Sequence, residues 1–160
     1  MFLADHLLNQ GVTDYLRKQE RSAIPIASPD SAPEPYLRQG CHPDIVQRVW
    51  DQLGSVLPQD SRCLVYGIPA LVHPVTGIVL AVCMGTQYCL RLNRGAMGGA
   101  LKLGAVTVMK WSANHVTNLT ETFGSDWIFG KWFKEEPEWC RVAYASLNNI
   151  QSNLINENLS

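Results

Sequence analysis

The chain has 160 residues, and its 13 Lys and Arg against 14 Asp and Glu give a formal net charge of −1. That balance provides no general attraction to nucleic acid or to an anionic membrane, and we expect neither as a partner. A secretory signal has a basic region followed by a continuous apolar stretch, and the start of the chain, MFLADHLLNQ, has neither. The most apolar run, Gly77–Gly85, is far shorter than the ~20 residues of a membrane helix. We therefore expect one soluble, cytoplasmic domain over residues 1–160.

The cysteines and histidines show no metal-binding or redox spacing. None of the five cysteines forms a CxxC pair, and Cys63, Cys83 and Cys89 lie in β-like runs, where a thiol behaves as a small buried hydrophobe. The four histidines form neither HExxH nor His-x-His and no pair at helical spacing. We expect no metal site and no cofactor.

Two helices and a connector are predicted in the first third of the chain. Residues 1–20 indicate a helix because their apolar side chains approximate one helical face: Phe2, Leu3, Leu7, Leu8, Val12, Tyr15 and Leu16. Residues 22–40 contain four prolines among Ser and Ala, which predicts an extended connector. A second helix is indicated from Pro43, which suits a first helical position, to Leu57, where Pro58 follows.

The middle of the chain predicts a sheet. Cys63–Tyr66 and Ala70–His73 are β-like, with a bend or bulge expected at Gly67 and Pro69, and Pro74–Gly77 has the composition of a turn. Ile78–Cys83 is apolar throughout and is expected to be central. In Gln87–Leu92, Tyr88, Leu90 and Leu92 alternate with Gln87, Cys89 and Arg91, which predicts one covered and one wetter face. Ala105–Trp111 is expected to be a fourth strand.

A glycine-rich segment, Arg94–Gly104, precedes that fourth strand. It has neither the GxxxxGK[ST] nor the GxGxxG pattern, so we expect a flexible connection. Its amides, with Arg94 or Lys102, leave an anion site as the alternative. A final helix is expected near Glu135, with Pro137 in its first turn. Its expected buried stripe is Trp139, Val142, Ala143, Leu147, Ile150 and Leu154.

Together these elements predict an α+β fold, in which helices pack a small, mainly antiparallel sheet of about four strands. A Pro-rich N-terminal connector precedes the core at residues 42–160, whose C-terminal part is rich in aromatic residues. Leu64–Gly67, Gly77–Val82 and Tyr88–Leu92, which cover about a fifth of the chain, resemble the small α+β domains of the TfoX N-terminal and YjbR-like families. That resemblance implies a compact sheet packed by helices. Some family members are DNA-associated, but the neutral charge and the lack of a basic helix oppose that role here, and no functional residue is carried over.

For function, we expect no catalytic residue, because the chain has no GxSxG elbow and no pattern that pairs a nucleophile with a base. Exposed Trp and Phe side chains can anchor a protein interface, and the partner-binding candidates are Trp127, Phe129, Trp132 and Phe133. The alternative is that these aromatic side chains close the domain's own core. The favoured hypothesis is a non-enzymatic protein-binding module, such as a bacterial immunity or antitoxin-type inhibitor that acts by surface complementarity.

Two other functions stay open. A small-ligand-binding protein or an enzyme would use the wetter sheet face, and its candidate residues are His73, Gln87, Cys89, Arg91 and Arg94. A structural homodimer would form through the terminal helix.

Overall fold

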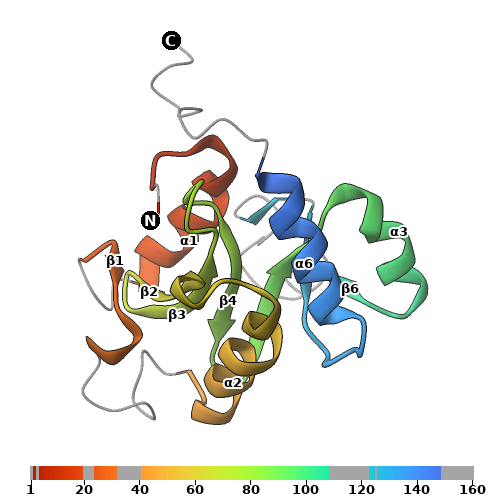
Figure 1. Ribbon diagram of the computed structural model, residues 1–160, viewed down its shortest axis with the longest axis horizontal. Coiled ribbons are helices and arrows are strands. Elements are labelled where there is room, and N and C mark those ends of the chain that lie inside the picture. The colour runs from red at the N-terminus through yellow and green to blue at the C-terminus, as the bar shows by residue number, and fades with distance from the viewer. Residues whose placement is uncertain are drawn as a thin grey trace.

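The computed structural model describes residues 2, 4–19, 24–31, 41–108, 123–124 and 126–148 (Figure 1). At its centre is one antiparallel sheet in the order β1-β2-β3-β4-β5-β7-β6. The strands are β1 (Ile26–Ala27), β2 (Arg62–Val65), β3 (Ile68–Val72), β4 (Val79–Met84), β5 (Gln87–Arg91), β6 (Val106–Thr107) and β7 (Trp127–Phe129). The α+β class is confirmed, but the expectation of about four strands is wrong, because the described residues form a sheet of seven. Three of them have only two or three residues, too few to show an alternating pattern in the sequence.

Two tight hairpins set the register of the sheet. Tyr66 and Gly67 join β2 to β3 with φ angles of 49° and 82°, and Val65 pairs with Ile68. Two positive φ angles form the two-residue turn whose twist matches that of the strands. This hairpin replaces the bend or bulge expected there. The β4–β5 hairpin has an equally short connection, with Met84 paired to Gln87.

The expected turn at Pro74–Gly77 connects β3 to β4. Gly77 has a φ of 74°, and its N–H donates to the carbonyl of His73 at 2.8 Å. The expectation that one face of β5 is wet is wrong: Cys89 is fully buried and Arg91 is 7% exposed. β5 lies between β4 and β7, and both of its faces are covered.

The predicted helix at residues 43–57 forms as three consecutive helical segments. They are α2 (Pro43–Arg48), a π-helical turn at Val49–Leu53 and a 3-10 turn at Gly54–Val56. Trp50 fixes them to the sheet: its indole N–H donates to the carbonyl of Ala70 at 3.0 Å, and its own carbonyl accepts from Arg62 Nε at 2.9 Å.

The terminal helix α6 (Glu136–Leu147) packs beside these turns and against β4 and β5. It begins within a residue of the expected start. Ala143 and Leu147 of the expected stripe are buried, Trp139 and Val142 are half-buried, and Ile150 and Leu154 lie outside the described residues. Tyr88 on β5 donates its hydroxyl hydrogen to Glu136 Oε1, so the first turn of α6 is tied directly to the sheet.

The N-terminal helix lies against the other face of the sheet. Successive strand residues point to opposite faces, so Arg91 and Tyr88 mark the two sides of β5. Arg91 contacts the carbonyl of Leu8, whereas Tyr88 contacts α6. The helix begins later than expected, as a 3-10 turn at Leu7–Asn9 followed by α1 (Gln10–Gln19). Asn9 fixes this end, because its amide donates to the carbonyl of Gly77 and accepts from Val79 N.

The glycine-rich segment is not the expected flexible connection. It forms a helix, α3 (Arg94–Lys102), which stands at the right of Figure 1. Gly104 closes it with a φ of 100°, and Ala105 N donates to the carbonyl of Ala100 at 3.0 Å. This is the Schellman arrangement, which satisfies the last helical carbonyls.

The Pro-rich connector contributes β1 at the edge of the sheet and a 3-10 turn at Pro29–Ser31, and its residues 32–40 lie outside the described part. The expected strand Ala105–Trp111 is represented by β6, and its residues 109–111 are also outside. Among the described helices, none is long and apolar enough to cross a membrane.

Candidate functional site

The residues of the ligand-binding alternative do not converge. Gln87 and Arg91 are the first and last residues of β5, about 13 Å apart for a strand of this length. Cys89 is buried between them, and its thiol contacts Met84 Sδ at 3.2 Å. Arg94 is exposed at the start of α3. Arg91 alone of these residues lines the pocket described below.

His73 has the contacts of a structural histidine. Its Nδ1 accepts from the amides of Val75 and Thr76, at 3.2 and 3.1 Å, and its Nε2 lies 2.8 Å from Asn148 Oδ1. Its ring stacks on Tyr144 of α6, with 4.2 Å between the ring centroids. Since His73 is fully buried, these contacts hold α6 to the β3–β4 turn.

The aromatic candidates divide into two groups. Trp127 and Phe129 are 1% and 5% exposed and belong to the buried core rather than to a surface. Trp132 and Phe133 are half-buried. The Trp132 ring packs at a tilt against Tyr88, with 4.3 Å between centroids, and the Arg48 guanidinium lies 3.8 Å from the Trp132 ring centre.

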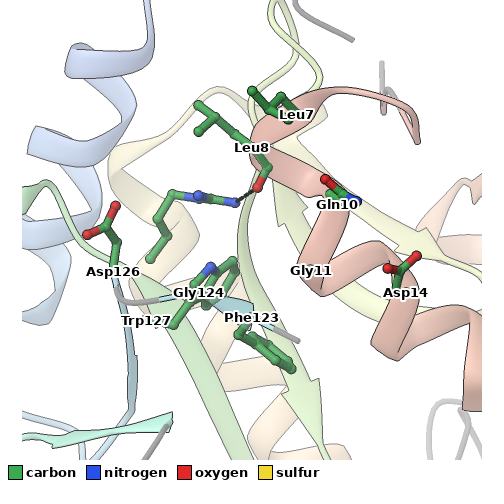
Figure 2. Close-up of a pocket in the computed structure, with 10 residues that line it drawn as sticks. Leu7, Leu8, Gln10, Gly11, Asp14, Phe123, Gly124, Asp126 and Trp127 are labelled. Atoms are coloured by element: carbon green, nitrogen blue, oxygen red, sulfur yellow. Dashed lines mark hydrogen bonds between the residues drawn. The ribbon is translucent and has the colours of Figure 1, made fainter. Parts of the chain in front are cut away.

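A pocket of about 460 Å³ opens between α1 and the strands β5 and β7. Figure 2 shows its walls. They are formed by Leu7, Leu8, Gln10, Gly11, Asp14, Arg91, Phe123, Gly124, Asp126 and Trp127. The structure thus brings together Arg91, a candidate for ligand binding, and Trp127, a candidate for partner binding. The two residues face each other across β5 and β7, and the Arg91 Cζ lies 4.8 Å from the centre of the Trp127 ring.

Arg91 is the buried cation of this pocket. Its Nε donates to the carbonyl of Val79 at 2.8 Å and its Nη2 to the carbonyl of Leu8 at 2.9 Å. Burial lowers the pKa of Arg91 to about 10, and the nearby Asp126 opposes part of that shift. The guanidinium therefore stays charged at neutral pH. Within the described residues, Nη1 has no hydrogen-bond partner, so one arm of the fork is uncommitted.

Trp127 adds a second buried donor. Its indole Nε1 is buried and has no hydrogen-bond partner among the described residues. Most buried polar atoms in proteins are hydrogen-bonded, so a buried N–H without a partner beside a pocket calls for an explanation. Phe123 packs edge-on against the Trp127 ring at 5.2 Å between centroids and holds it in place.

Two carboxylates stand at the sides of the pocket. Asp14 extends from α1, and Asp126 precedes β7 on the other side (Figure 2). Neither forms an ion pair with any residue that the structure describes. The lining therefore combines buried donors with accessible acceptors and the apolar side chains of Leu7, Leu8 and Phe123.

Sequence patterns point to only part of this pocket. Arg91 is conspicuous as a cation within an apolar strand, and Trp127 as one of several clustered aromatic residues. Asp14 and Asp126 carry no such signal, because single aspartates on a helix or in a turn are common surface residues. Among the described residues, no group of three His, Cys, Asp or Glu is placed to hold a metal ion.

Comparisons with protein-family models, curated proteins and solved structures found no match to this chain. The resemblance to the TfoX N-terminal and YjbR-like domains stays a prediction from the sequence.

Proposed function

We propose that this protein binds a small molecule through an anionic group placed against Arg91. The observation that carries the proposal is a buried, charged guanidinium with one uncommitted arm beside the unpartnered indole N–H of Trp127. A carboxylate or phosphate oxygen would accept from the uncommitted arm of Arg91, and hydrogen bonds to a charged donor are the stronger kind. A pocket of about 460 Å³ is within the size range of small-ligand sites.

The test is ligand-dependent thermal stabilisation, with a panel of small carboxylates and inorganic phosphate. A compound present at about ten times its Kd stabilises the native state by about 1.4 kcal/mol, which raises the Tm by about 3–6 °C for a domain of this size. Arg91→Gln is expected to abolish that rise. Arg94→Gln, which removes an exposed arginine outside the pocket, is the matched control and should leave the rise unchanged.

Arg91 is buried, so replacing it by a neutral residue can also affect folding. Arg91→Lys is therefore a second variant, which keeps the positive charge but loses the planar guanidinium. It should fold and bind more weakly than the wild type. The proposal is wrong if no anion in the panel raises the Tm, or if Arg91→Gln responds to the anions as the wild type does.

The second candidate function is the protein-binding module, an inhibitor of the immunity or antitoxin type. What favours it is the half-buried Trp132 with the Arg48 guanidinium over its ring, next to the half-buried Phe133. Trp and Arg are the residues most enriched at the centres of protein interfaces. Trp132 also has a φ of 58°, a conformation that costs a non-glycine residue about 1–3 kcal/mol and is common at binding sites.

That candidate is tested by capture from the native host, followed by rebinding of the purified partner. Arg48→Glu should weaken the rebinding at least tenfold, whereas Arg94→Glu should not affect it. Equal rebinding by both variants would rule out the Trp132 surface.

A further inference from the structure

The lining of the Arg91 pocket carries charges of both signs. Arg91 provides one positive charge, and Asp14 and Asp126 provide two negative charges from opposite sides (Figure 2). A ligand that carried only a carboxylate would add a third negative charge to this lining. A ligand that carried only an ammonium would leave the uncommitted arm of the buried Arg91 without an acceptor and would place a second positive charge beside it, both of which are unfavourable.

We infer that the ligand is a zwitterion, a small molecule with both a carboxylate and a primary ammonium, and this inference rests on the proposed function. Its carboxylate accepts from Arg91, and its ammonium donates to Asp14 or Asp126. The apolar walls formed by Leu7, Leu8 and Phe123 contact its side chain. Free apolar amino acids and the ends of short peptides share this chemistry.

The experiment compares matched probes by isothermal titration calorimetry at neutral pH. L-phenylalanine carries both charges, N-acetyl-L-phenylalanine only the carboxylate, and L-phenylalaninamide only the ammonium. Glycyl-L-phenylalanine keeps both charges but places them farther apart, which separates a free amino acid from a peptide as the source. We expect L-phenylalanine or the dipeptide to bind at least tenfold more tightly than either singly charged probe.

Substitutions test which side chain binds the ammonium of the ligand. Asp14→Asn and Asp126→Asn remove carboxylates without changing side-chain size. At least one of them should weaken the binding of the zwitterion several-fold, and the affinity for N-acetyl-L-phenylalanine should be unchanged or higher. Asp51→Asn, an exposed aspartate in the turn after α2, is the matched control and should change nothing. Circular dichroism of each variant checks that the fold is retained.

The outcomes separate the two proposals. Equal binding of L-phenylalanine and its N-acetyl derivative would overturn the zwitterion inference and leave anion binding in place. Equal binding of L-phenylalanine and its amide would also overturn it. No binding by any probe, together with no stabilisation by the anion panel, would overturn the proposed function itself.

Discussion

Gly130 shows how closely one backbone position can be determined by a side chain from another strand. A Cβ at this position would lie 1.8 Å from the Tyr88 ring. The ring cannot move away easily: its hydroxyl donates to Glu136 and accepts from the amide of Trp132 at 2.8 Å. The glycine is therefore required by close approach and not by an unusual φ angle.

The first prediction is that Gly130→Ala lowers the free energy of unfolding by about 1–3 kcal/mol or more, because the added methyl overpacks a fixed aromatic ring. Urea denaturation measures it. Gly98→Ala is the matched control: Gly98 lies in α3 with open space around it, so alanine should raise stability by about 0.5–1 kcal/mol. Similar effects of the two substitutions would contradict the close contact.

His73 makes the stability of the molecule depend on pH. Its Nδ1 accepts two amide hydrogens, so the neutral ring carries its proton on Nε2 and donates it to Asn148. Burial lowers the pKa of His73 below 6.5, and the hydrogen bond with Asn148 opposes part of that change. A protonated Nδ1 could no longer accept from the turn.

The second prediction follows from the sign of that shift. The unfolded chain binds the proton more tightly, so the contribution of His73 to stability is complete above about pH 6.5 and is lost as the pH falls towards the native pKa. The urea midpoint should therefore drop more between about pH 7 and about pH 5.5 in the wild type than in His73→Asn. Asn keeps a short acceptor for the turn amides and does not titrate.

At the scale of elements, Glu136 joins α6 to the sheet. Its carboxylate is fully buried and accepts from Tyr88 through Oε1 and from the amides of Lys131 and Phe133 through Oε2, at 2.9 and 3.2 Å. An acid at the first turn of a helix also interacts favourably with the helix dipole. One side chain thus fixes the loop before α6, the start of α6 and the start of β5.

The third prediction is that Glu136→Gln lowers the free energy of unfolding by about 1–3 kcal/mol. An amide has one accepting oxygen, so one side of this network faces an N–H₂ donor and stays unsatisfied in a buried site. Chemical denaturation measures the loss. Glu138→Gln on the same helix is the control, because Glu138 is exposed and pairs only with the equally exposed Arg141 among the described residues. A loss for Glu138→Gln as large as that for Glu136→Gln would contradict the assignment.

At the scale of the whole molecule, the thiols report on global unfolding. All five cysteines are buried and carry thiols rather than disulfides. Burial raises the pKa of Cys63 and of Cys140 to about 12 and the pKa of Cys83 and Cys89 well above the ordinary value. The reactive species is the thiolate, so none of these four side chains is activated in the native state.

The fourth prediction is that the native protein shows no rapidly reacting thiol towards Ellman's reagent, whereas all five react in denaturant. The native rate should follow the free energy of unfolding across the Gly130, His73 and Glu136 variants. Fast labelling of one cysteine in the stable wild type would reveal local opening at that position.

Much of the fold followed from local patterns. The apolar run of β4, the turn at Pro74–Gly77 and the acidic, proline-containing start of α6 are each determined by neighbours in the sequence. The short strands β1 and β7 were missed because two or three residues extend only when a partner strand pairs with them. The helix α3 was missed because three glycines lower helix propensity, and the Gly104 cap that closes it was not recognised.

The sequence alone therefore determined the class of the fold, the helices α1, α2 and α6 and the strands β2 to β5, and it named Arg91 and Trp127 as candidates for two different roles. The tertiary structure decided the number of strands, the burial of both faces of β5 and the meeting of these residues with Asp14 and Asp126. The reason is the distance along the chain over which each interaction acts. Turn chemistry and periodicity act over a few residues, whereas the pocket joins α1 to strands β5 and β7, which are far from it along the chain and are brought together by the packing of the sheet.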